Sequence, residues 1–339
     1  MRGYAVIIVN EKPVAGSKFK ERKGGAKDAD NLQRAFCTKL KFKWLNQGQG
    51  RDLKKSEWIH SAEVAPPSNC DCITCKIQNT NHENSECFLL VLSSHGGEVK
   101  GEQQIRFSDG GAVKLSEIIN ALSDEKCPSL KGKPRILILQ ACRSNPDRPE
   151  AERDDSGYEV QVETGMRNMN IDDTETNSAD ENDTQPETGN ELGQGDQLKN
   201  PNKTTAEADH EGTEVSSSGE ESDPDVEEDN SGQPLCYISK NFLIVYPSAA
   251  GKRAKRNTSK GSWLIDELCK VIDEHDFQNN TEMNFLKLLT GAAGRVACKE
   301  AKPTKFMNAP CIVHRLIEPL IFKDIADETE NVPTDKPAL

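Results

Sequence analysis

The sequence has no long hydrophobic run, since the longest purely apolar stretch, residues 87–92, is about six residues in a chain of 339. A membrane-spanning helix needs about 20 apolar residues, so no transmembrane segment is expected. The amino end, residues 1–10, carries one basic residue and too short an apolar stretch for a signal peptide. The 11 cysteines therefore indicate reduced thiols and not a disulfide framework. We expect a soluble, cytoplasmic protein.

Large apolar residues are also scarce between residues 150 and 230, which contain no Phe, Trp or Cys. These 81 residues hold 26 acidic and four basic residues, a local net charge of −22, whereas the other 258 residues carry +9. Such a stretch cannot bury enough apolar surface to offset the entropy lost on ordering, so we expect an acidic, disordered linker. The overall charge of −13 argues against nucleic acid and anionic membranes as partners.

Short, continuous apolar runs alternate with helical patterns in the rest of the chain. Continuous apolar runs indicate strands that are covered on both faces, as in a parallel sheet. We expect strands at residues 4–9, 88–92, 136–139, 242–246 and 311–316, and helices at 26–40, 114–122, 262–272 and 282–297. The pattern predicts an α/β fold: an open, mostly parallel β-sheet with helices on both faces.

Two of the expected strands end in residues that can carry out nucleophilic chemistry. Residues 88–92 lead into Ser-Ser-His95-Gly96-Gly, and residues 136–139 lead into Gln-Ala-Cys142-Arg-Ser. Open α/β sheets place their sites at the carboxyl edge, where a thiol and an imidazole could meet. His95 could take the proton of Cys142 and later protonate a leaving amine. Gly96 lets a backbone N–H approach the oxyanion, with the N–H of Cys142 as the second donor.

The spacing of these residues resembles that of the caspases, the aspartate-directed cysteine endopeptidases. His95 lies 47 residues before Cys142. Cys142 itself lies in a pentapeptide, residues 140–144, that is similar to the caspase Gln-Ala-Cys-Arg-Gly signature. Further segments that resemble the family, in the family's order, are residues 2–8, 22–32, 241–248, 256–263 and 310–313.

The resemblance implies a caspase-like fold and an endopeptidase that cleaves after Asp, in apoptosis or related proteolytic signalling. Its layout is closest to the executioner type, without a recognisable prodomain. The chain then divides into a large catalytic subunit (residues 1–149), the acidic linker (150–232), a small subunit (233–322) and a polar tail (323–339). Dimerisation is expected through the last strand, from Cys311 to Leu316, and protein segments containing exposed Asp are the expected substrates.

The resemblance also assigns the residues that would recognise a substrate carboxylate. Arg22 and Arg256 fall on the family's two pocket arginines, and Gln140 on its pocket glutamine. Guanidinium groups suit this role because they bind a carboxylate through two parallel hydrogen bonds. Asn257 and Trp263 match residues that shape the fourth subsite.

Two departures from the family pattern leave alternatives open. Ser144 replaces the usual Gly, and Arg253 and Lys255 stand where many members carry aromatic residues against the P2 side chain. These departures would also suit a catalytically inactive homologue that acts as a dimerising regulator. A third alternative is an Arg- or Lys-specific peptidase like the metacaspases. It would need an acidic pocket, and Arg22 with Arg256 argues against it. The basic cluster at residues 251–256 also resembles a nuclear-localisation patch, so nuclear entry is a further hypothesis.

The linker contains two expected cleavage sites for activation of a zymogen. Asp155 precedes Ser-Gly, and Asp229 precedes Asn-Ser-Gly. Small residues after the cut and a disordered context favour access by a protease, either another copy of the chain or an upstream activating enzyme.

A last cluster, Cys70-x-Cys72-x-x-Cys75 with His82 seven residues on, has ligand types that could hold zinc. The spacing is not that of a standard finger, and the resemblance implies no metal there. We therefore expect reduced loop thiols, no metal site and no cofactor.

Overall fold

The structure is a computed structural model that describes residues 1–60, 70–145, 238–301 and 307–325. These residues belong to one compact unit. The expected cleavage sites Asp155 and Asp229 lie outside the described residues. Among the helices of the described ranges, none is long and apolar enough to cross a membrane.

A six-stranded sheet forms the centre of the unit, in the order β12-β8-β7-β3-β1-β2. All neighbours in this sheet are parallel except β12 and β8. The strands are β1 (Gly3–Val9), β2 (Lys43–Trp44), β3 (Cys87–Ser93), β7 (Arg135–Gln140), β8 (Phe242–Tyr246) and β12 (Cys311–His314). The sequence-based prediction of a mostly parallel sheet is confirmed, and the last strand is the antiparallel one.

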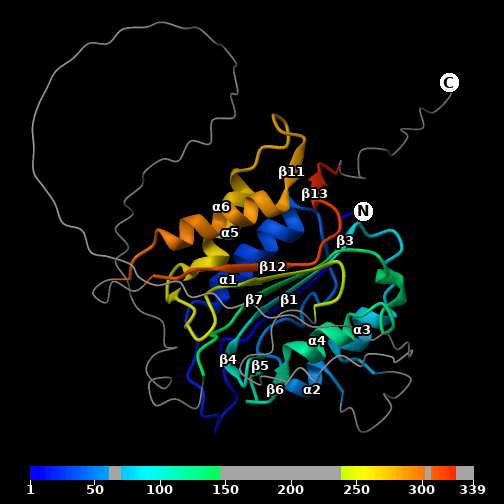
Figure 1. Ribbon diagram of the computed structural model, residues 1–339. Coiled ribbons are helices and arrows are strands. Elements are labelled where there is room, and N and C mark those ends of the chain that lie inside the picture. The colour runs from blue at the N-terminus through cyan, green and yellow to red at the C-terminus, as the bar shows by residue number, and fades with distance from the viewer. Residues whose placement is uncertain (61–69, 146–237, 302–306, 326–339) are drawn as a thin grey trace, which may run out of the picture. The chain divides into compact units, whose positions relative to one another are not determined.

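Helices cover both faces of this sheet (Figure 1). One face carries α1 (Gly25–Leu32), the π-helical segment Gln33–Lys39, α5 (Trp263–Glu274) and α6 (Phe285–Ala297). The other carries α2 (Lys55–Trp58), α3 (Ile73–Asn79), α4 (Leu115–Ala121) and the 3₁₀ turn Pro128–Leu130. Alternate residues of β1 serve the two cores: Ile7 packs toward the first group and Ile8 toward the second. Burial on both faces explains the continuous apolar runs of the sequence.

Smaller sheets surround the central one. A three-stranded antiparallel sheet consists of β4 (His95–Val99), β5 (Glu102–Arg106) and β6 (Ala112–Lys114). Two short antiparallel pairs complete the set: β9 (Arg256–Asn257) with β10 (Gly261–Ser262), and β11 (Glu282–Asn284) with β13 (Ile321–Lys323). β4 follows β3 directly, so this small sheet begins at the carboxyl edge of the central sheet.

Candidate active site

The register of β3 and β7 brings the two reactive side chains to the same edge of the sheet. Ser93 pairs with Gln140 at the end of the parallel ladder. His95 and Cys142 each lie two residues beyond this pair, on neighbouring strand ends. The next backbone hydrogen bond runs from Ser94 N to Gln140 O at 3.1 Å and holds the two strand ends together. A parallel ladder thus positions residues that are distant in sequence side by side.

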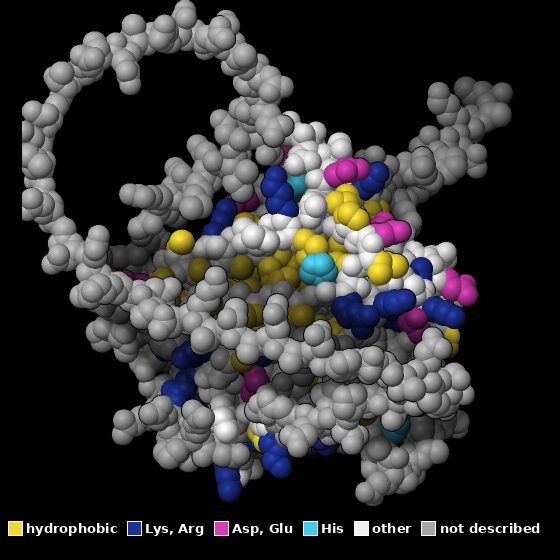
Figure 2. Space-filling view, viewed as in Figure 1, with side chains coloured by type: hydrophobic (Ala, Val, Ile, Leu, Met, Phe, Trp, Pro, Cys, Tyr) yellow, Lys and Arg dark blue, Asp and Glu magenta, His cyan; other side chains and the backbone are white. Residues whose placement is uncertain are grey.

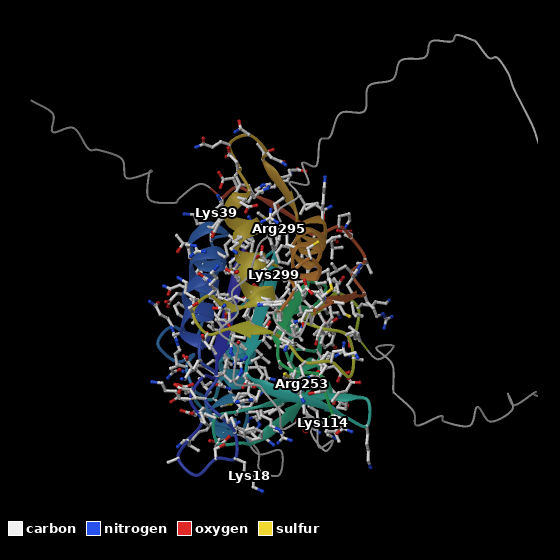
Figure 3. The ribbon with its side chains drawn as sticks, turned by 90° about the vertical axis from the view of Figure 1, so that its left-hand side faces the viewer. Lys18, Lys39, Lys114, Arg253, Arg295 and Lys299 are labelled. Carbon is white, nitrogen blue, oxygen red and sulfur yellow. The ribbon has the colours of Figure 1, made fainter. Side chains whose placement is uncertain are left out.

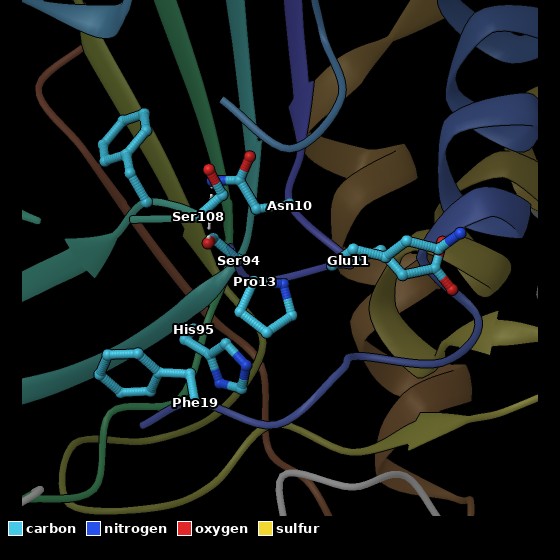
Figure 4. Close-up of a pocket in the computed structure, with 9 residues that line it drawn as sticks. Asn10, Glu11, Pro13, Phe19, Ser94, His95 and Ser108 are labelled. Atoms are coloured by element: carbon cyan, nitrogen blue, oxygen red, sulfur yellow. Dashed lines mark hydrogen bonds between the residues drawn. The ribbon is translucent and has the colours of Figure 1, made fainter. Parts of the chain in front are cut away.

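The imidazole of His95 is held by the segment between β1 and α1. Its Nε2 lies 2.7 Å from the carbonyl oxygen of Lys20, and its ring packs against Phe19 with centroids 5.2 Å apart. Figure 4 shows these two rings beside each other. A carbonyl oxygen only accepts hydrogen bonds, so Nε2 carries the proton and Nδ1 is the basic nitrogen of the neutral ring. The ring of Phe19 also lies 5.2 Å from the guanidinium of Arg106, the residue that pairs with His95 across β4 and β5.

A small pocket lies next to the imidazole on the side of this segment (Figure 4). Its lining includes Pro13, Phe19, Ser94, His95 and Ser108. Asn10, at the end of β1, donates a hydrogen bond to Ser94 Oγ at 3.1 Å and closes one wall. The pocket lining does not include Cys142, so the pocket lies beside His95 and not between the two reactive groups.

Gly96 has no room for a side chain. A Cβ there would lie 2.7 Å from the carbonyl oxygen of Gln104 and 2.8 Å from the Cβ of Ala141. The β4–β5 pair therefore packs directly against the residue that precedes Cys142. This is a steric requirement for glycine in addition to the expected approach of an oxyanion.

Cys142 is buried and its surroundings are fixed through the backbone. Gln103, also buried, donates from Nε2 to the carbonyl oxygens of Cys142 at 3.1 Å and of Gly97 at 3.3 Å. The next residue, Arg143, stacks on the ring of Tyr246 at 4.2 Å and pairs with Glu98 at 3.2 Å. Burial raises the pKa of Tyr246 to about 12, so its ring is uncharged under the guanidinium.

The two candidate pocket arginines are both buried and share one carboxylate neighbour. Arg22 donates to the carbonyl oxygens of Asn10 at 3.0 Å and Gln140 at 3.4 Å. Arg256 donates from Nε to the carbonyl oxygen of Lys23 at 2.9 Å. Asp28 interacts electrostatically with both guanidinium groups.

Asp28 is fully buried and accepts hydrogen bonds from Ser262, through the backbone N–H at 2.7 Å and the hydroxyl at 2.5 Å. Burial raises the pKa of Asp28, while the bonds from Ser262 and the two arginines act in the opposite direction. Gly261, at φ +91°, lies against this carboxylate, and a Cβ there would meet Oδ1 at 2.3 Å. Asp28 therefore joins α1 to β10 in the immediate surroundings of the arginines.

The other predicted pocket residues lie close to this cluster. Gln140 is buried, and its Oε1 has no hydrogen-bond partner among the described residues. Asn257 Oδ1 accepts three hydrogen bonds from Ser259 and Lys260, which shapes the β9–β10 turn. Trp263 begins α5 and is buried, with the ammonium of Lys299 5.9 Å above its ring.

The basic cluster at residues 251–256 contacts the segment that carries Cys142. Arg143 N donates to Lys252 O at 2.9 Å, and Gly251 N donates to Arg143 O at 3.2 Å. Figure 3 shows Arg253 at the same end of the ribbon as Lys18 and Lys114, opposite Lys39 and Arg295. A positively charged loop therefore adjoins the candidate nucleophile.

The sequence proposes His95 and Cys142 as candidates, and the structure places them on neighbouring strand ends, but the sequence did not point to the residues that contact them. His95 is contacted by Phe19 and Lys20, and the carbonyl of Cys142 by Gln103. These contacts span 39 to 76 positions along the chain, so no local sequence pattern reveals them. Asp28 lies within residues 22–32, which resemble the family, but the sequence alone indicates no role for it. Its position six residues after Arg22 is the only signal in the sequence, since its other arginine neighbour, Arg256, lies 228 positions further on.

A thiol and an imidazole at the carboxyl edge of an α/β sheet are the two side chains that a cysteine peptidase requires. The comparisons with known proteins agree with this class. Residues 2–321 match the model of the caspase domain family, and the chain belongs to this family.

Relatives and solved structures extend this result. The chain is 23% identical to caspase-6 of Gallus gallus over 95% of this chain and 80% of the relative. It is 22% identical to caspase-3 of Oryctolagus cuniculus over 94% of this chain and 83% of that protein. The crystal structure of caspase-1 from Spodoptera frugiperda matches with a TM-score of 0.55 and 21% identity, covering 95% of this chain and 90% of that one. The predicted caspase-like fold is confirmed.

Proposed function

We propose that this member of the caspase family is a cysteine endopeptidase that cleaves after Asp, with Cys142 as nucleophile and His95 as acid and base. The observation that carries the proposal is the Ser93–Gln140 pairing, which brings His95 and Cys142 to adjacent strand ends. A second support is the Lys20 carbonyl at His95 Nε2, which leaves Nδ1 as the base.

The chemical steps follow from this arrangement. His95 Nδ1 takes the thiol proton, and the sulfur of Cys142 attacks the scissile carbonyl carbon. The oxyanion would accept hydrogen bonds from the backbone N–H groups of Gly96 and Cys142. Protonated His95 then gives its proton to the leaving amine, and water hydrolyses the thioester to release the acid and the free thiol.

Charge within the arginine cluster supports a preference for Asp. Arg22 and Arg256 contribute two positive charges, and Asp28 contributes one negative charge when ionised. The surplus of one positive charge among these buried groups suits one further carboxylate, which a substrate Asp would supply. The amide of Gln140 would add a hydrogen bond to that carboxylate, and Asn257 and Trp263 would form the wall of the fourth subsite.

The remaining features of the proposal concern activation and assembly. Cleavage at Asp155 or Asp229, by another copy of the chain or an upstream protease, would activate a zymogen located in the cytoplasm. Dimerisation would use β12, an edge strand with half-buried side chains, followed by Ile317, which is 69% exposed. Figure 2 shows apolar side chains across the middle of the face on which β12 lies.

The test is intact mass after expression of the wild type beside Cys142→Ala, followed by assay with tetrapeptide reporters. We expect wild-type fragments that end at Asp155 or Asp229, an uncut Cys142→Ala chain, and turnover of reporters with Asp at P1 but not Asn. A matched thiol variant, Cys298→Ala, removes an exposed cysteine and should behave as wild type. No turnover by cleaved, dimeric protein, together with no labelling of Cys142 by an Asp-containing aldehyde, would instead identify a catalytically inactive homologue.

A further inference from the structure

The helical layer that carries α2 and α3 holds a cluster of four potential metal ligands. The ligand atoms of His60, Cys70, Cys72 and Cys75 all lie within 4.8 Å of one another. Within the described ranges, no other group of three or more His, Cys, Asp or Glu residues was found with this geometry. We propose that these four residues bind one structural Zn²⁺ ion.

The distances fit tetrahedral coordination. His60 Nδ1 lies 3.5 Å from Cys75 Sγ and 3.8 Å from Cys72 Sγ. With Zn–S bonds of about 2.3 Å and Zn–N bonds of about 2.0–2.1 Å, a tetrahedron places nitrogen and sulfur ligands about 3.6 Å apart. The side chains therefore stand at the separation that a single ion requires.

The local fold arranges these ligands before any ion binds. Cys72 caps the N-terminus of α3, and its sulfur accepts a hydrogen bond from Cys75 N at 3.5 Å. Thr74, between them, donates to the carbonyl oxygen of Trp58 at 2.7 Å, two residues before His60. Trp58 and Ile73 are buried in the same core, so α2 and α3 are fixed next to each other. A pre-arranged ligand set loses little conformational entropy on binding.

The chemistry of the donors selects the metal. Three thiolates and one imidazole make a Cys₃His set, which is typical of structural zinc and unsuited to Mg²⁺ or Ca²⁺. All four tetrahedral positions are filled by protein, so no open position remains for water or substrate. The site is therefore structural and separate from the thiol and imidazole of Cys142 and His95.

The structure also corrects the sequence-based view of this cluster. His82, the histidine considered with these cysteines, is fully buried and lies edge-on to the rings of Tyr4 and Phe88. Its Nε2 donates to the carbonyl oxygen of Ile77 at 2.9 Å. Cys72 and Cys75 are buried at the start of a helix and are not loop thiols. The fourth ligand is His60, which precedes the cysteines in the chain.

Binding would join two segments that are separated in sequence. His60 precedes residues 61–69 and Cys70 follows them. An ion bound by both residues would link His60 to Cys70. Because it binds only the folded state, it would stabilise that state against unfolding.

The experiment uses untagged, full-length Cys142→Ala protein, so that the active-site thiol cannot contribute to metal binding. Zinc content is measured by mass spectrometry after purification, and Co²⁺ exchange is followed by the visible absorption of tetrahedral cobalt thiolates. We expect one ion per chain. We expect its loss in Cys70→Ser and in His60→Ala, both partly exposed positions where substitution leaves the core intact. Cys298→Ser and His82→Gln are matched controls that should keep the ion.

Thermal unfolding gives a second readout. A chelator should lower the melting temperature of the Cys142→Ala protein and of both controls, and should leave Cys70→Ser unchanged. The proposal is overturned by sub-stoichiometric zinc, by retention of the ion in Cys70→Ser and His60→Ala, or by loss of the ion in His82→Gln alone. A disulfide among the three cysteines, or copper or an iron–sulfur cluster in place of zinc, also overturns it. None of these results depends on peptidase activity.

Discussion

Ser262 donates two hydrogen bonds to the carboxylate of Asp28, one from its backbone N–H at 2.7 Å and one from its hydroxyl at 2.5 Å. The two residues are 234 positions apart in the sequence, with Asp28 before residues 146–237 and Ser262 after them. Since Arg22 and Arg256 act on the same carboxylate, this contact helps to fix the cluster proposed to bind substrate Asp.

Asp28→Ala should therefore destabilise the protein by about 3–5 kcal/mol, because it leaves two buried guanidinium groups without their carboxylate. Ser262→Ala keeps the backbone donor and loses only the hydroxyl bond, which predicts about 1.5–3 kcal/mol. Urea unfolding in the Cys142→Ala background measures both. Asp30→Ala, an exposed acid on the same helix whose pair with Arg51 spans 3.4 Å, is the control and should cost less than about 1 kcal/mol. Equal effects of Asp28→Ala and Asp30→Ala would contradict the prediction.

Gln103 should act as a positioning residue for Cys142. Gln103→Glu places oxygens against the carbonyl groups of Cys142 and Gly97, which the amide now binds at 3.1 and 3.3 Å. We expect the misaligned loop to raise the activation free energy by about 1.4 kcal/mol, which lowers kcat by about tenfold. The rate of iodoacetamide alkylation of Cys142, measured against pH, separates this effect from a general loss of stability. Gln104→Glu, at the neighbouring half-buried position, is the control, and an unchanged alkylation profile in Gln103→Glu would exclude the positioning role.

Gly96→Ala should abolish activity and destabilise the fold, because the added Cβ meets the Gln104 carbonyl oxygen at 2.7 Å and Ala141 Cβ at 2.8 Å. Gly291→Ala is the matched control: it lies in α6 with open space around its Cβ position. It should stabilise the protein by up to about 1 kcal/mol through helix propensity. Thermal unfolding and reporter turnover distinguish the two variants, and wild-type behaviour of Gly96→Ala would show that the loop can move aside.

His82 should make the fold sensitive to acid. Burial lowers the pKa of this imidazole from 6.5, with Lys133 and Arg135 acting in the same direction. The unfolded chain therefore binds a proton more readily than the folded one, so stability is present above about pH 6.5 and is lost as the pH falls toward the lower folded pKa. His82→Gln, which keeps a donor for the Ile77 carbonyl, should flatten the stability profile in this range. Denaturant unfolding from pH 5 to 8 is the measurement; parallel profiles for the two proteins would contradict it.

The central sheet was predictable because each of its main strands is buried on both faces and reads as an unbroken apolar run. The small sheet was not: β5 has the sequence Glu-Gln-Gln-Ile-Arg, and only Gln103 and Ile105 of this strand are buried. The four-residue helix α2 is too short for a periodic signal. His95 and Cys142 are candidates because of their spacing in the sequence, whereas His60 belongs to the thiol cluster only through contacts over 12 and 15 residues.

The pairing of β7 with β8 joins the segments on either side of residues 146–237 through a parallel ladder from Arg135–Phe242 to Ile138–Val245. If the chain is cut between β7 and β8, the native sheet remains intact, but the kinetic order of its folding reaction changes. The uncut chain folds unimolecularly, with the entropy of closing the intervening segment as its cost. The processed protein is two polypeptides, so its refolding becomes bimolecular and its apparent stability depends on concentration. Once denatured at low concentration, the cut form would return slowly, and its persistence would be governed by its unfolding rate.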